Sequence, residues 1–114
     1  LAFQELSYGE GYFFKSKQNL NFTIVGTLPE TVVLGIKQGM NLFGIASLEN
    51  KDIADVVVQS PAEHNVTELG KRNADGTYNL ATYYPSGWNN VFTLETGIGY
   101  WLKANKDFIL ILNP

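Results

Sequence analysis

The chain has 114 residues, with 8 Lys+Arg against 11 Asp+Glu and a net charge of -3. This length supports one hydrophobic core and leaves no room for a second. No apolar run approaches the roughly 20 residues of a membrane-spanning helix. The mild acidity and scattered lysines exclude the basic footprint of a nucleic-acid-binding protein. With no cysteine, disulfides and thiolate metal sites are also excluded. Because the chain starts at Leu1 and not at Met, we expect that a leader was removed or that it is a segment of a longer protein.

The first half of the chain reads as short β-strands broken by glycine or proline. Strands are expected over 12–15, 21–25 and 31–36, and a buried apolar strand over 42–48. A short helix is expected near 51–58, with Asn50 as its N-cap and apolar residues at helical spacing.

The second half returns to β-structure. Strands are expected over 66–72 and 77–84, flanking a hairpin turn at 73–76 with glycine where φ must be positive. A turn at 85–87 and strands over 91–94, 99–104 and 108–112 follow. The sequence therefore predicts a single all-β, mainly antiparallel module over 1–114, a small β-sandwich or barrel with one short helix.

An internal repeat is the strongest signal in the sequence. Residues 7–26 match residues 95–114 at an offset of 88, with identical residues at Gly9/Gly97, Gly11/Gly99, Tyr12/Tyr100 and Lys15/Lys103. Each copy reads as a tight turn, an aromatic strand, a polar turn and a second strand. Repetition at fixed spacing is typical of arrays in which neighbouring units complete one another.

The repeated motif resembles a known kind of module. Gly9-Glu10-Gly11-Tyr12-Phe13-Phe14-Lys15 and the segment Ile36–Ile45, with Met40 where tryptophan is usual, resemble a Gly-Trp-Asn / Gly-x-Gly-Tyr-Trp repeat module of bacterial, archaeal and viral exported surface proteins. The resemblance implies an exported, multi-domain protein of a cell wall, envelope or virion. It brings no catalytic residue with it.

Candidate reactive residues have simpler structural interpretations. The Gly-x-Gly pairs precede strands rather than helices, so we interpret them as turn glycines and not as a phosphate loop. His64 is the only imidazole, Ser86 lacks a nucleophile-elbow motif, and residues 73–76 form a turn better than a calcium loop. The acidic pairs Asp52/Asp55 and Glu63/Glu68 predict no cleft. We therefore expect no enzyme, no catalytic residue, no cofactor and no metal.

The aromatic residues leave two interpretations open. In the first, Phe13, Trp101 and one tyrosine of each adjacent pair fill the core. In the second, exposed aromatics form a platform for sugar rings or a partner protein, with Tyr83, Tyr84 and Trp88 as the candidates. Adjacent tyrosines in a strand face opposite sides, so one of Tyr83 and Tyr84 should face solvent.

The leading hypothesis is a non-catalytic structural module of an exported cell-surface, filament or virion protein. It would assemble through strand or edge contacts with neighbouring copies or adjacent modules, in an extracellular or cell-surface location. The alternative is a glycan-binding or adhesion module that uses exposed aromatics. Neither involves nucleic acid or a membrane span. Asn21 and Asn65 lie in glycosylation acceptor triplets, and both are candidates for modification.

Overall fold

The computed structural model describes residues 7–13, 15–19, 21, 23, 26–27, 30–60 and 62–113. Its elements in chain order are β1 (Val32–Ile36), β2 (Gly39–Phe43), β3 (Lys51–Asp52), α1 (Ile53–Val56), β4 (Val66–Arg72), β5 (Tyr78–Tyr84), β6 (Gly87–Asn89), β7 (Thr93–Leu94), β8 (Tyr100–Ala104) and β9 (Phe108–Leu112). All strand pairs are antiparallel, so the predicted all-β class with one short helix is confirmed. In the described part of the chain, no helix is long and apolar enough to cross a membrane.

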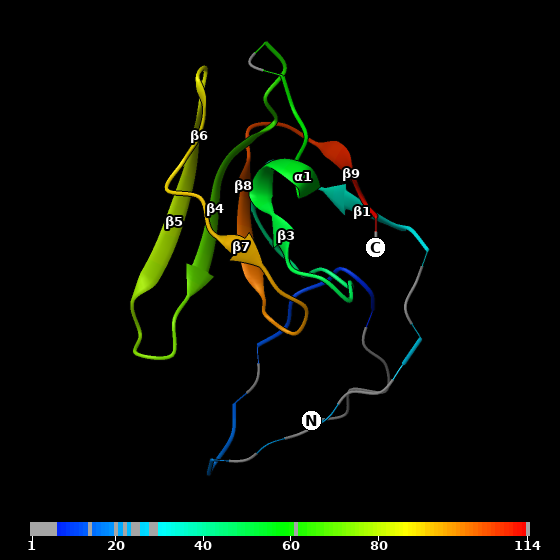
Figure 1. Cartoon of the computed structure of the whole chain (residues 1–114), viewed down its shortest axis with the longest axis vertical. Helices are drawn as coiled ribbons and strands as arrows, with labels where there is room; N and C mark the ends of the chain where they lie inside the picture. Colours follow the sequence, from blue (N-terminus) through cyan, green and yellow to red (C-terminus); the bar gives the residue numbers. More distant parts are fainter. Residues whose placement is uncertain are drawn as a thin grey trace.

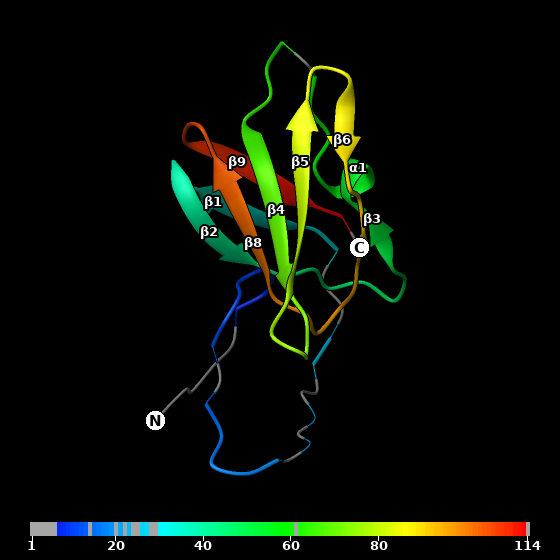
Figure 2. The same cartoon turned by 90° about the vertical axis from the view of Figure 1, so that its left-hand side faces the viewer.

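A five-stranded sheet in the order β2-β8-β4-β5-β6 forms the body of the molecule (Figure 2). β8 lies at its interior, with Tyr100 opposite Phe43 of β2 and Leu102 opposite Leu69 of β4. Since successive side chains of a strand point to opposite faces, Tyr100, Leu102 and Ala104 face the core, and Trp101 and Lys103 face outward.

The core lies between this sheet and a separate two-stranded ladder. β1 and β9 pair over their full length, and they run behind the five-stranded sheet and across its strands (Figure 2). Their inward residues Ile36, Leu110 and Leu112 join the core that Phe43, Leu69, Leu102 and Tyr100 form from the sheet. Helix α1 contributes Ile53 on the same inner side, next to the small β3–β7 pair (Figure 1).

Several predicted elements differ from the structure. Residues 12, 13 and 15 of the strand expected over 12–15 lie in no strand, and the strand expected over 91–94 is limited to Thr93–Leu94. The helix expected near 51–58 is limited to Ile53–Val56, because Lys51–Asp52 pairs with β7 and the Asp52 side chain forms no capping hydrogen bond. The strand expected over 42–48 is Gly39–Phe43. Beyond Phe43, the Gly44 N–H donates to the Gly9 carbonyl and the Ser47 N–H to Thr96 Oγ1, so the chain leaves β8.

The hairpin at 73–76 is confirmed. The turn is closed by a 2.7 Å hydrogen bond that the Asn73 N–H donates to the Thr77 carbonyl. Gly76 has the predicted positive φ, at 89°. Asp75 accepts hydrogen bonds at Oδ1 from the Thr77 N–H and hydroxyl, and these bonds hold the pKa of the Asp75 carboxyl below its usual value.

The prediction that aromatic residues fill the core holds for one of the repeated tyrosines and is wrong for Phe13 and Trp101. Tyr100 is 1% exposed and lies at the centre of the core, between the rings of Phe43 and Phe92. Phe13 is 72% exposed, and Trp101 lies on the outer face of the sheet. The reason for Trp101 is the strand alternation: once Tyr100 faces inward, its neighbour must face outward.

Candidate functional site

The three aromatics predicted as a platform do not form one surface. Tyr83 and Trp88 make an edge-to-face pair with ring centroids 5.2 Å apart, and Trp88 packs against the core. The Tyr83 ring also lies 5.5 Å from that of His64. Tyr84 is exposed, and it follows Tyr83 in β5, so it lies on the opposite face of the sheet. Tyr83 and Trp88 therefore support the core side, and Tyr84 stands apart from them.

A different aromatic pair occupies the outer face of the five-stranded sheet. The rings of Tyr78 and Trp101 stack with centroids 5.1 Å apart and planes inclined by 24°. Gly70 lies opposite Trp101 in the register, where a β-carbon would be in ordinary van der Waals contact with Trp101 Cε3 at 3.6 Å. Sequence reasoning missed this pair because its members are far apart in the chain and meet only across β4.

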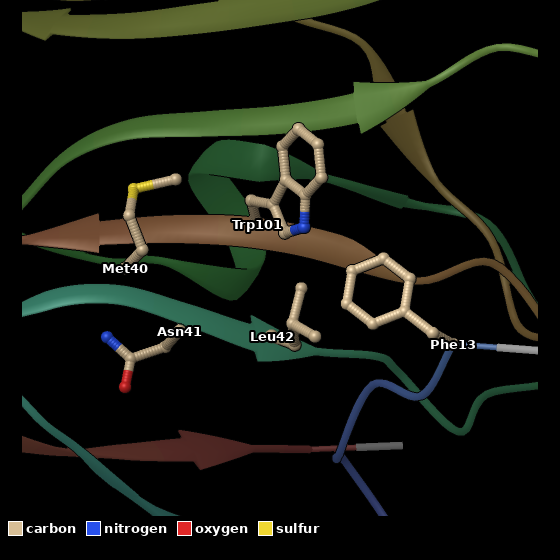
Figure 3. Close-up of a pocket in the computed structure, with 5 residues that line it drawn as sticks. All are labelled: Phe13, Met40, Asn41, Leu42 and Trp101. Atoms are coloured by element: carbon tan, nitrogen blue, oxygen red, sulfur yellow. The ribbon is translucent and has the colours of Figure 1, made fainter. Parts of the chain in front are cut away.

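The apolar surface continues from Trp101 toward the β2 edge. Phe13, Met40 and Leu42 project toward the indole from neighbouring segments, while the Asn41 side chain points away (Figure 3). Together they line a shallow hollow of about 260 Å³. Glu68 and Lys103 are register partners on the same outer face and place one carboxylate and one ammonium group beside the aromatic surface.

A second exposed apolar surface is the outer face of the β1–β9 ladder. Val33 pairs with Ile111, and Gly35 pairs with Ile109. The exposed fractions are 62% for Val33, 67% for Ile109 and 55% for Ile111, and neither strand contains a charged residue. Within the described ranges, no third strand pairs with this ladder, so each strand has an outer edge without a strand partner.

The internal repeat is also a repeat in three dimensions. In the first copy the Ser7 N–H donates to the Tyr12 hydroxyl at 2.8 Å, and in the second the Glu95 N–H donates to the Tyr100 hydroxyl at 2.8 Å. The donors are 88 residues apart, and so are the acceptors. We call residues 7–12 the first tyrosine turn and residues 95–100 the second tyrosine turn.

The backbone of the two turns matches as well. Each is closed by a 3.4 Å hydrogen bond, from Glu10 N to the Ser7 carbonyl in the first turn and from Ile98 N to the Glu95 carbonyl in the second. The leading glycines have positive φ values, 81° at Gly9 and 92° at Gly97. Together with residues 44–46, the two turns line one cavity of about 550 Å³.

Burial around the second turn changes the acidity of its tyrosine. Desolvation raises the pKa of the Tyr100 hydroxyl above its usual value, the hydrogen bond from the Glu95 backbone opposes this, and the Glu95 carboxylate adds to it. The fold therefore favours the neutral Tyr100 hydroxyl, which is buried and accepts a hydrogen bond from the Glu95 N–H.

The remaining candidates are spread over the surface. Asn21 is exposed, whereas Asn65 is half-buried and its Oδ1 is enclosed without a hydrogen-bond partner. The His64 carbonyl accepts a hydrogen bond from Asn105 Nδ2 at 2.9 Å. Among the described residues, no group of three or more His, Cys, Asp or Glu side chains could hold a metal ion.

Comparisons with protein-family models, with curated proteins and with solved structures found no match to this chain. The resemblance to a surface-protein repeat module therefore stays a prediction from the motif.

Proposed function

We propose that the chain is a non-catalytic structural module that assembles with copies of itself or with adjacent modules. The supporting observation is the β1–β9 ladder, which has an uncharged outer face of β-branched side chains and an open edge on each strand. Such edges accept an added strand, and natural proteins usually protect them with charge, proline or a covering segment. Neither strand of this ladder contains a charged residue or a proline.

The contact would join the ladders of two copies. Val33, Ile109 and Ile111 would lie in the interface, and edge pairing would add main-chain hydrogen bonds. Pairing of the β1 edge of one copy with the β9 edge of the next would be a head-to-tail contact, and such a contact produces a filament when it does not close into a ring. The extracellular or virion-surface location is part of the proposal and rests on the resemblance of the repeated motif.

Sedimentation equilibrium on Ile111→Lys tests the role of the ladder. The parent chain should gain average mass with concentration, and the lysine variant should lose most of this gain because a charge would be buried in the contact. Leu48→Lys is the matched control, since Leu48 is exposed in a loop away from the ladder and its replacement should leave association unchanged. A strictly monomeric parent chain, or equal effects of the two variants, would contradict the proposal.

A second candidate function rests on the Tyr78–Trp101 stack. Two nearly parallel rings on a flat sheet suit stacking against the apolar face of a sugar ring, and Glu68 and Lys103 offer hydrogen bonds beside it. On a glycan array, Trp101→Ala should lose binding. Trp88→Ala should keep it, because Trp88 packs on the opposite side. If no glycan binds the parent chain, the alternative fails.

A further inference from the structure

The two tyrosine turns have the same conformation but different surroundings. The first turn is covered by β1 and β2: the Gly44 N–H donates to the Gly9 carbonyl at 2.8 Å, and Glu10 forms an antiparallel bridge with Phe43. The corresponding glycines of the second turn, Gly97 and Gly99, are exposed. Among the described residues, the glycines of the first turn are therefore covered by strands. The glycines of the second turn are exposed, although Thr96 of that turn bonds to Ser47.

The glycines make this difference quantitative. A β-carbon on Gly9 would lie 2.9–3.0 Å from the side chains of Val32 and Leu34, and one on Gly11 would lie 2.9 Å from Leu42 Cβ. At Gly97 and Gly99, a β-carbon would meet no atom of the described residues within 4 Å. The first turn thus requires glycine because strands pack directly on it.

Gly99 has no such requirement within its own module. Its φ is not in the positive region and its surroundings are open. Its counterpart Gly11 also lacks a positive φ. Glycine is needed at position 11 because Leu42 of β2 lies against its backbone. The same close approach at Gly99, by a strand of another module, would account for glycine there.

We propose that the second tyrosine turn is the docking site for the β1–β2 segment of a second copy of this chain. Val32, Leu34 and Leu42 of that segment would pack on Gly97 and Gly99 as they pack on Gly9 and Gly11 within the chain. Gly44 N–H of the second copy would donate to the Gly97 carbonyl. The cavity that both turns line gives access to Gly97 and Gly99.

The proposed contact is head-to-tail, and in it one turn is exchanged for the other. Within a single copy, β1 and β2 are already covered by the first turn, so the second turn of one copy must replace the first turn of another. The contact that forms, between the second turn of one copy and β1–β2 of another, resembles the contact that breaks, between the first turn and β1–β2 of the same copy. A change that weakens the contact of the first turn should therefore favour the exchange. This inference rests on the proposed assembly function and specifies which surfaces would meet.

Gly11→Val is the change that weakens the first turn. Its Cβ would lie 2.9 Å from Leu42 Cβ and 3.2 Å from the Phe43 backbone nitrogen, so residues 9–11 should leave β2. Measured by sedimentation equilibrium in the Ile111→Lys background, where the ladder contact is blocked, this variant should associate at least tenfold more tightly than the background alone. Gly11→Ala is a milder version, used if the valine variant loses its circular dichroism signature.

Gly99→Val provides the decisive second substitution. Position 99 has open space in the single copy, so this variant should fold with an unchanged Tm, yet it should block docking. Adding it to the position-11 variant should return the chain to the background affinity. Association that survives Gly99→Val, or a folded position-11 variant that does not associate, would overturn the proposal. Because the ladder is blocked throughout, failure of the ladder contact leaves this test intact.

Discussion

Removing the Tyr100 hydroxyl should destabilise the fold through one hydrogen bond. In Tyr100→Phe the ring stays in its buried site, but the Glu95 N–H loses the acceptor that lies 2.8 Å away. An unmade hydrogen bond of this kind costs about 1 kcal/mol of unfolding free energy. With an unfolding entropy of about 2.1 cal/mol/K per residue, the 114-residue chain should lose about 4 °C in Tm.

The matched control is Tyr12→Phe, which removes the equivalent hydrogen bond from the first turn. Ser7 is exposed, so water can replace the lost acceptor, and we expect a loss below about 0.5 kcal/mol. Urea and thermal denaturation followed by circular dichroism would measure both. If Tyr12→Phe destabilises as much as Tyr100→Phe, or if Tyr100→Phe has no effect, the role given to the buried hydroxyl is wrong.

Three further predictions concern pH and packing. Because burial raises the pKa of Tyr100, the unfolded chain ionises this group first, so stability should decline as the pH rises above about 10, and Tyr100→Phe should reduce the decline. Hydrogen bonds from Thr77 lower the pKa of Asp75, so the stability they provide should be lost as the pH falls below about 4. In an acid titration, Asp75→Ala should lose less stability over this pH range than the parent chain. Leu69→Ala should cost about 2–5 kcal/mol in urea denaturation, whereas Leu48→Ala should change stability by less than about 0.5 kcal/mol.

The strands that the sequence predicts best are those with strong local patterns. β4 and β9 have the predicted bounds, and β5 and β8 begin one residue late. β2 differs because its limits depend on distant partners: Gly44 and Ser47 bond to the two tyrosine turns, which no local pattern encodes. Similarly, the sequence predicts a turn at 85–87 and no strand directly after it, but Gly87 begins β6, which pairs with β5.

The surfaces were less predictable than the strands. The repeat predicts that two turns share a conformation. It does not predict that strands cover the glycines of only the first turn, since that depends on where β1 and β2 lie. The Tyr78–Trp101 stack depends on the registers of β4 with β5 and β8. Its one sequence signal is Gly70, a glycine in the middle of β4 opposite Trp101. The second strand of the first repeat falls largely outside the described residues.

Hydrogen exchange at low and high protein concentration tests the assembly proposal most directly. If copies meet through the β1–β9 ladder, amides of residues 32–36 and 108–112 should exchange at least several-fold more slowly at high concentration, while those of β6, an edge strand elsewhere, stay unchanged. Equal exchange at both concentrations, or protection confined to other strands, would contradict the assembly of this chain through its ladder.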